Sequence, residues 1–289
     1  MKPQDFGMDT ITLAGTLESK LAAIRAGGFT HVMLSARDIV GHPQGDDAAI
    51  AAVRASGLRV TGLQVMRDFE GLGGALHDYK LDVAKSMLRL CHALGSTLLL
   101  VCSSTSRHAT GDPDALVADL CKLATLAIPL NIRIAYEALS WGRHVNKVEQ
   151  AWSLIAQADR SNLGLVIDSF HSLASGIDWA LLEEISPEKV YFVQLSDFMW
   201  EAIPSFEDRI ETARHFRVFP GEGVHGEAVT RLIQALDDMG YAGDYSFEVF
   251  NDDYVQMPPG TVVERANRAV RWVIDRVPRQ NLPVRRRPA

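Results

Sequence analysis

The sequence predicts an α/β fold, a (β/α)8 TIM barrel built as one domain. Short β-like runs alternate with amphipathic helical stretches along the chain, and eight such pairs can be counted in its 289 residues. This alternation produces right-handed crossovers and a parallel sheet, and eight units suit a closed barrel. A hydrophobic content of 47% is sufficient for one large core. A doubly wound open sheet is the alternative, but the Gly-rich dinucleotide fingerprint is missing after the first strand.

The predicted strands are short apolar runs, and they cover residues 11–13, 30–34, 58–63, 96–101, 132–137, 163–168, 190–195 and 244–250. Helices are predicted from apolar periodicity and from end signals. In the first helix, Leu17, Leu21 and Ile24 share one face. Asp112 and Pro113 open another helix as its N-cap and first residue. The remaining predicted helices cover residues 46–57, 76–95, 146–159, 178–184, 225–239 and 262–276.

One connection is unusually long. Residues 196–224 join the seventh strand to the next helix and carry Met199, Trp200, Phe206 and several acids. Long loops after barrel strands are commonly lids or substrate walls. A surface excursion that packs its own aromatic side chains is an equally good interpretation.

Charge and composition exclude several classes of function. The net charge is −7 and the pI is about 5.7, whereas nucleic-acid binders more often have a pI above roughly 9. We therefore expect no nucleic-acid partner. The basic run Arg285-Arg286-Arg287 falls in residues 278–289, which we interpret as a solvated C-terminal tail after a barrel domain spanning residues 1–277.

The lack of a targeting signal and the pattern of cysteines predict a cytoplasmic protein. The first residues lack an apolar signal segment, and no run reaches the roughly 18 apolar residues of a membrane span. We therefore expect no membrane partner. Cys91, Cys102 and Cys121 show no CxxC spacing, and an odd number of cysteines is typical of a reducing compartment. Small buried apolar side chains are the simplest interpretation of all three.

Oxygen-bearing side chains end four consecutive predicted strands. These residues are Glu137, Asp168, Gln194 and Glu248. Because active sites of barrels lie at the carboxyl ends of the strands, we expect the four side chains to meet. Three carboxylates at one place repel one another, and a bound cation would offset that repulsion. An all-oxygen set favours one divalent ion such as Mg²⁺, Mn²⁺ or Co²⁺.

Two histidines are candidates for the same site. His171 lies three residues after Asp168, which places it in the loop beside the metal, where it could move a proton. A histidine that caps the next helix is the alternative. His144 is a similar case, with a substrate contact and a structural role equally open.

Cationic residues near this acidic mouth suggest an anionic substrate. Arg214, His215 and Arg217 precede a Pro-Gly turn, and Arg67 follows the third predicted strand. A guanidinium group binds a carboxylate with two parallel hydrogen bonds. Arg67 and Arg217 are the residues that we expect to contact the ligand.

At these residues the chain resembles the xylose-isomerase-like barrel superfamily, and within it the metal-dependent bacterial 3-dehydroshikimate dehydratases. The blocks that carry the resemblance are Tyr136-Glu-Ala-Leu-Ser-Trp-Gly-Arg-His-Val-Asn146, Val166-Ile-Asp-Ser-Phe-His171, Val193-Gln-Leu-Ser-Asp197, Arg214-His-Phe-Arg-Val-Phe-Pro-Gly-Glu-Gly223 and Phe247-Glu-Val-Phe-Asn-Asp252. They span nearly the whole barrel. The resemblance implies metal ligands at Glu137, Asp168, Gln194 and Glu248, a catalytic histidine at His171, and substrate contacts at Arg67 and Arg217.

The function implied by the resemblance is a lyase that converts 3-dehydroshikimate to protocatechuate. Its substrate would be a small anionic cyclic hydroxy-ketone. His171, Glu137 or Glu248 would take the carbon proton made acidic by the ketone, and a ring hydroxyl would leave as water. A metal-dependent ketose isomerase or epimerase, or an inosose dehydratase, is the alternative. A metal-dependent nuclease and a barrel that binds a ligand without turnover are further alternatives, and a homo-oligomer is compatible with the sequence.

Overall fold

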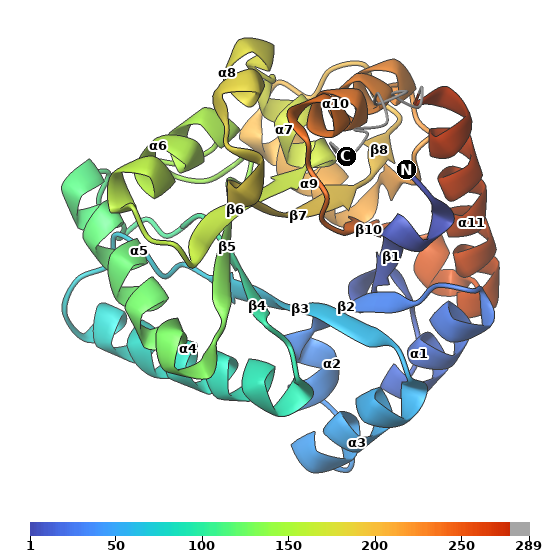
Figure 1. Ribbon diagram of the computed structural model, residues 1–289, viewed down its shortest axis with the longest axis horizontal. Helices are drawn as coiled ribbons and strands as arrows, with labels where there is room; N and C mark the ends of the chain where they lie inside the picture. Colours follow the sequence, from blue (N-terminus) through green and yellow to red (C-terminus); the bar gives the residue numbers. More distant parts are fainter. Residues whose placement is uncertain (278–289) are drawn as a thin grey trace, which may run out of the picture.

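The computed structural model describes residues 1–277. Within them, eight parallel strands form a closed barrel in the order β1-β10-β7-β6-β5-β4-β3-β2, and helices surround it (Figure 1). The barrel strands are β1 (Phe6–Asp9), β2 (His31–Ser35), β3 (Arg59–Arg67), β4 (Leu98–Cys102), β5 (Arg133–Glu137), β6 (Leu163–Asp168), β7 (Val190–Leu195) and β10 (Tyr245–Phe247). The predicted (β/α)8 fold is therefore confirmed.

The ring closes where the first and last strands pair in parallel. Phe6 lies opposite Tyr245 on one side, and Met8 lies opposite Val32 on the other. The prediction of a first strand at residues 11–13 was wrong, because residues 10–12 form a 3-10 helix after β1. The true strand, Phe-Gly-Met-Asp, contains a glycine and a buried acid, so its sequence does not look like a strand.

Several other strand boundaries differ from expectation, and the largest differences are in the third and eighth strands. The eighth strand was predicted at 244–250, but β10 spans Tyr245–Phe247, so Glu248 follows it directly. The third strand is longer than predicted and includes Arg67 as its last residue. Both differences still leave these side chains at the carboxyl end of the barrel.

The helices around the barrel are α1 (Leu17–Ala26), α2 (Ala36–Val40), α3 (Asp46–Ser56), α4 (Gly74–Leu94), α5 (Pro113–Ala127), α6 (Val148–Ala158), α7 (Ser169–Ser175), α8 (Trp179–Glu184), α9 (Phe206–His215), α10 (Gly226–Met239) and α11 (Pro259–Arg276). Their ends follow the predicted signals. The Asp112 side chain accepts a hydrogen bond from the Asp114 amide at the start of α5. Gly95 ends α4 with a φ of 72°, a left-handed conformation that glycine adopts without strain.

The long connection 196–224 has structure of its own. It contains β8 (Asp197–Phe198), α9 and β9 (Arg217–Val218), and β8 and β9 pair in an antiparallel hairpin with Phe198 opposite Arg217. Phe198 and Ile203 pack in a small apolar cluster with Phe170. The segment therefore covers part of the barrel mouth with an ordered layer rather than an irregular loop.

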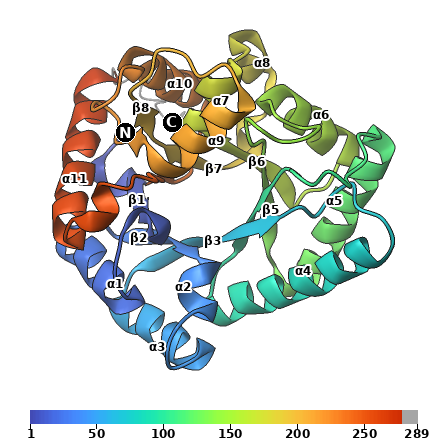
Figure 2. The same cartoon turned by 180° about the vertical axis from the view of Figure 1, so that it is seen from behind.

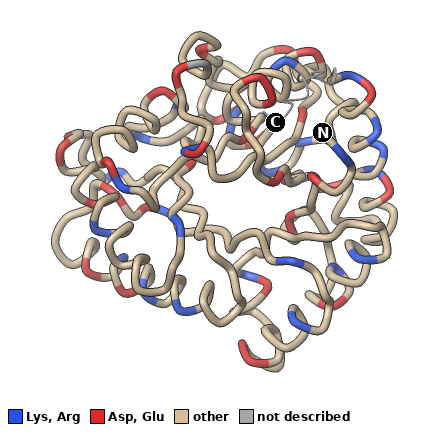
Figure 3. Tube along the Cα trace, viewed as in Figure 1, with Lys and Arg blue, Asp and Glu red and all other residues tan. Residues whose placement is uncertain are grey.

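Charged residues of both signs are mixed along the outer helices (Figure 3). None of the helices within residues 1–277 combines the length and the apolar composition that crossing a bilayer requires. Cys91 and Cys102 are buried thiols and Cys121 is half-buried, and none of the three is in a disulfide. The predicted tail at 278–289, with its three arginines, lies outside the described residues.

Candidate active site

A cavity of about 310 Å³ lies at the carboxyl ends of the strands. Figure 2 shows this face of the barrel, on which α2 and α9 lie. The polar side chains that line the cavity come from several strands and from the long connection: Ser35, Arg37, Gln64, Arg67, Cys102, Glu137, His171, Arg214, Arg217 and Glu248. Apolar walls from Leu139, Trp141 and Phe250 complete it. Its size and mixed lining are typical of a small-molecule site.

A larger hollow of about 1180 Å³ lies outside the barrel, against α8, α10 and α11. Its lining contains Trp179, Trp272 and Arg231, and none of the predicted site residues. Barrel enzymes carry their chemistry at the carboxyl ends of the strands, so the smaller cavity is the candidate active site.

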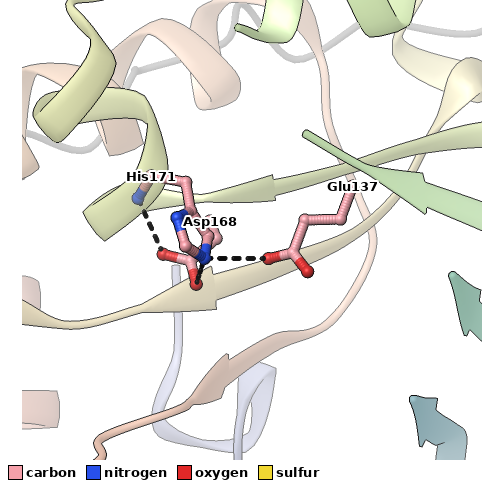
Figure 4. Close-up of side chains that lie close together, drawn as sticks. All are labelled: Glu137, Asp168 and His171. Atoms are coloured by element: carbon pink, nitrogen blue, oxygen red, sulfur yellow. Dashed lines mark hydrogen bonds and ion pairs between the residues drawn. The ribbon is translucent and has the colours of Figure 1, made fainter. Parts of the chain in front are cut away.

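Three of the predicted site residues form a compact cluster. Glu137 ends β5, Asp168 ends β6, and His171 lies in the first turn of α7. One ligand atom from each lies within 4.8 Å of the others, and the side chains point toward one another (Figure 4). The His171 Nε2 atom is 3.9 Å from Glu137 Oε1 and 3.9 Å from Asp168 Oδ2. This cluster is a possible metal site.

Asp168 has two roles, one for each carboxylate oxygen. Its Oδ1 atom caps α7 by accepting hydrogen bonds from the amides of Phe170 at 2.6 Å and His171 at 3.4 Å. Its Oδ2 atom is 2.7 Å from the Nη1 atom of Arg217. One oxygen of Asp168 therefore caps α7, and the other contacts Arg217 and lies in the cluster with Glu137 and His171.

The other two predicted ligands lie on the neighbouring strands. Gln194 in β7 is opposite Asp168 in β6 and Ser246 in β10. Glu248 follows β10, and its Oε2 atom is 3.0 Å from the Arg217 Nη1 atom that Asp168 also contacts. The barrel therefore brings all four predicted ligands to one end, and Asp168 and Glu248 share one guanidinium nitrogen.

Two buried oxygens that lack a hydrogen-bond partner within residues 1–277 show whether a cation would fit here. The Oε1 atoms of Glu137 and Gln194 are buried and have no hydrogen-bond partner among residues 1–277. A buried acceptor without a partner is costly, and a bound cation would remove that cost. Carboxylate and amide oxygens suit a hard divalent cation. The residues present therefore fit the predicted metal.

The pKa values of the acids respond to this crowding. Burial raises the pKa of Glu137 to about 8, and the charges of Asp168 and Glu248 add to the shift. Burial raises the pKa of Glu248 to about 7 against the opposing charge of Arg217. Burial also acts to raise the pKa of Asp168, but the charge and hydrogen bond of Arg217 contribute to a net decrease. Near neutral pH and without a cation, Glu137 is therefore mostly protonated and Glu248 is partly protonated.

Metal affinity should consequently depend on pH. Protons on Glu137 and Glu248 must leave before these groups bind a cation, so affinity is highest above their pKa values of about 8 and about 7 and falls as the pH decreases. We expect the apparent affinity for Mn²⁺ to fall roughly 1000-fold from pH 8 to pH 6. Calorimetric titration in two buffers of different ionisation enthalpy would also count the protons released. Equal affinities at the two pH values would contradict this expectation.

His171 is buried and neutral. Burial lowers its pKa to about 3, and the positive charges of Arg217 and Arg67 act in the same direction. Its Nδ1 atom is 3.1 Å from the hydroxyl of Ser140, and its Nε2 atom is 3.2 Å from Arg217 Nη2. The backbone N–H of Ser140 also donates to Nδ1 at 3.2 Å. Arg217 Nη2 can only donate, so the lone pair that Nε2 offers at the cavity faces this guanidinium. The ring also packs edge-on against Trp141.

The two predicted substrate arginines have different surroundings. Arg217 is 2% exposed, lies between the rings of Phe170 and Phe250, and donates from Nε to the Ala213 carbonyl. Arg67 is exposed and lines the cavity, and its guanidinium has no hydrogen bond or ion pair with the part of the chain described here. Arg67 is therefore the guanidinium that is open to an incoming anion.

The remaining cationic candidates are His144, Arg214 and His215. His144 is not among the residues that line the cavity, and its Nε2 atom is 3.0 Å from the Ala109 carbonyl. Arg214 lines the cavity, whereas His215 is 3.1 Å from Asp252 at the surface. A substrate contact by His144 remains a prediction.

Sequence reasoning missed several buried polar residues at this end of the barrel. Asp9 is fully buried and contacts Gln194. Cys102 donates from Sγ to Glu137 Oε2 at 2.8 Å. Glu70 is 1% exposed and accepts a hydrogen bond from the Tyr136 hydroxyl, and burial raises its pKa to about 7. Asp9 is an acid at the end of a strand, which is the pattern that identified Glu137 and Asp168. It was missed because the first strand was predicted at residues 11–13 instead of Phe6–Asp9.

Comparison with known families assigns the chain to one class of barrel. The sequence model for the family described as xylose isomerase-like TIM barrel matches residues 21–275. The chain belongs to this family.

Individual relatives narrow the comparison. A 3-dehydroshikimate dehydratase from Pseudomonas aeruginosa is 40% identical over 250 residues, which cover 86% of this chain and 38% of the relative. The 3-dehydroshikimate dehydratase of Neurospora crassa is 27% identical over 318 residues, covering 89% of this chain and 88% of that protein. A solved structure of a xylose isomerase-like TIM barrel/4-hydroxyphenylpyruvate dioxygenase fusion protein has a TM-score of 0.88 and 35% identity, covering 95% of this chain and 43% of that one. The chain thus spans about two fifths of the Pseudomonas relative.

Proposed function

We propose that this protein is a metal-dependent lyase that converts 3-dehydroshikimate to protocatechuate and water. The observation that carries the proposal is the pairing, in one cavity, of a buried carboxylate cluster with an unpaired guanidinium, that of Arg67. The first feature suits a cation that polarises a ketone, and the second suits a substrate carboxylate. The name of the Pseudomonas aeruginosa relative, which is 40% identical to this chain over 250 aligned residues, supports the same reaction.

Glu137, Asp168, Gln194 and Glu248 would hold the divalent ion. When bound, such an ion supplies Lewis-acid stabilisation of the negative charge that develops on the substrate oxygen. The unsatisfied Oε1 atoms of Glu137 and Gln194 support this assignment. His171 would remain available as a neutral base.

Side chains of the protein carry out proton transfer and bind the substrate carboxylate. When Arg217 Nη2 no longer donates to it, the lone pair on His171 Nε2 takes the proton from the carbon next to the ketone. The electron pair of that C–H bond moves toward the ketone oxygen. The pair then returns to form a ring double bond, and the hydroxyl at the β-carbon leaves as water with the proton that His171 took from the carbon. Loss of one water and tautomerisation of the ring give the aromatic product without any oxidant. Arg67 holds the carboxylate during both steps.

The test is turnover of 3-dehydroshikimate by metal-free protein supplied with Mg²⁺, Mn²⁺ or Co²⁺. Product is followed as protocatechuate absorbance and identified by chromatography. A parallel panel of ketoses and inososes examines the isomerase alternative. Absence of turnover with all three ions would overturn the proposal, and turnover of neutral polyols in its place would favour the alternative.

Arg67→Met should raise the KM for 3-dehydroshikimate while leaving kcat within a few-fold. The guanidinium is exposed and unpaired within residues 1–277, so its loss removes a charge-assisted contact to substrate and costs the fold little. We expect a KM increase of about 10- to 100-fold, corresponding to roughly 1.4 to 2.7 kcal/mol. Initial-rate measurements over a range of substrate concentrations give both parameters.

Arg89→Met is the matched control for this variant. Arg89 lies on the exposed side of α4 and donates to the Ser86 hydroxyl, so its loss should change neither constant. An unchanged KM in Arg67→Met would show that the substrate carboxylate binds elsewhere.

A further inference from the structure

A network of buried polar side chains adjoins the predicted metal ligands. Asp9, Gln64, Gln194 and Ser246 are all at most 5% exposed. The Gln194 Nε2 atom donates to Asp9 Oδ2 at 2.7 Å and to Gln64 Oε1 at 3.3 Å. Gln64 Nε2 donates to the same Asp9 oxygen at 3.0 Å, and the Ser246 hydroxyl donates to Asp9 Oδ1. Every polar contact of Asp9 in this network is therefore one in which it accepts a hydrogen bond.

This network determines the orientation of the Gln194 amide. The two ends of a glutamine amide have nearly the same shape, so hydrogen-bond partners decide its orientation. Asp9 Oδ2 and Gln64 Oε1 are both acceptors, and they require the nitrogen. The oxygen is thereby turned away from them, and Gln194 Oε1 is left buried without a hydrogen-bond partner in residues 1–277.

We propose that Asp9 is a positioning residue for the metal, because it holds the Gln194 amide with its oxygen toward the cation. An amide oxygen is a good ligand for a hard cation, whereas the amide nitrogen carries donor hydrogens and is not. Reversal of the amide would replace a ligand by a positively polarised N–H group. The inference rests on the proposed metal site and adds a residue that touches neither metal nor substrate.

The experiment is a double-mutant cycle read out as metal affinity. Mn²⁺ is titrated calorimetrically into metal-free wild-type protein, Asp9→Leu, Gln194→Ala and the double variant. Loss of a partner that orients a metal ligand commonly reduces affinity about 10- to 100-fold, and we expect a loss of this size in Asp9→Leu. In the Gln194→Ala background the same substitution should cause no further loss, because Asp9 acts through Gln194.

Two other variants separate orientation from folding. Ser246→Ala removes the hydrogen bond to Asp9 Oδ1 and leaves Oδ2 unchanged, so it should keep wild-type affinity. Gln64→Met removes the second acceptor for Gln194 Nε2 without a large change in volume, and it gives a smaller loss that also disappears in Gln194→Ala. The Gln64→Met variant tests the orientation of the Gln194 amide even if Asp9→Leu does not fold. Thermal unfolding in EDTA shows whether each variant is folded.

The outcomes are distinct. Wild-type affinity in the folded Asp9 and Gln64 variants would overturn the inference, as would equal losses with and without Gln194. Those results would leave the proposed function intact. A wild-type protein that binds no Mn²⁺ would overturn the metal site and the role of Asp9 together.

Discussion

Glu137→Gln should abolish tight binding of Mn²⁺ and lower the turnover of 3-dehydroshikimate by at least roughly 1000-fold. Glu137 ends β5, and its Oε1 atom is a buried acceptor without a partner in the described chain. Glutamine keeps the shape but removes a negative charge from the cation site, and the Lewis-acid stabilisation lost with the ion amounts to several kcal/mol. Calorimetry and initial rates measure the two effects.

The same substitution should raise the melting temperature of the metal-free protein at neutral pH. Because the pKa of Glu137 is raised to about 8 in the folded protein, the acid contributes most to stability when it is protonated. That contribution decreases as the pH rises toward 8, since the ionised form is buried beside other acids. A neutral glutamine avoids this loss, so we expect an increase of a few degrees in EDTA at pH 8.

Glu264→Gln on the exposed side of α11 is the control, and it should alter neither metal binding nor stability beyond the error of measurement. Retention of tight Mn²⁺ binding by Glu137→Gln would show that Glu137 is not a ligand. A lower melting temperature in EDTA would show that the buried carboxylate is stabilised by contacts other than a cation.

His171→Gln should lower kcat by about 100- to 10,000-fold with little change in KM, as expected for loss of a general base. The side chain lines the cavity, and its Nε2 atom is the atom that we propose as base. The affinity for Mn²⁺ should remain within a few-fold of wild type, because the four predicted ligands are unchanged. Steady-state rates and a metal titration of the same preparation test both statements.

The metal titration distinguishes a His171 that acts as a base from a His171 that binds the metal. His171 lies within 4.8 Å of Glu137 and Asp168, so a histidine that binds the metal would reduce affinity and kcat together. That result would assign His171 as a ligand and transfer the role of base to another residue. His92→Gln, at the exposed end of α4, is the control and should have wild-type rates.

The acids of the site could be predicted because their sequence context is simple. Glu137 and Asp168 each end a short apolar run, and in a parallel barrel such ends meet by necessity. The contact between Arg217 and Asp168 could not be predicted, because it joins residues 49 positions apart through a hairpin inserted in the long connection. Asp9 was missed for another reason. Its strand is four residues long and lacks an alternating or uniformly apolar pattern.

The eight-stranded architecture was easier to predict than its details. Repeated strand and helix patterns over the whole chain support one another, so errors in single boundaries do not change the fold. Burial and pKa values, in contrast, depend on which side chains share a small volume. The low pKa of His171 results from its burial and from two arginines distant in sequence, Arg217 and Arg67. Such information exists only after the chain has folded.

The two carboxylate oxygens of Asp168 have a consequence for how this protein can change. One oxygen begins the helix that carries His171, and the other belongs to the acidic cluster. The spacing between the acidic cluster and His171 is therefore set by a single turn of backbone. Under the proposed function, substitutions in the cavity walls would change substrate selection without changing the distance between the metal ligands and the base.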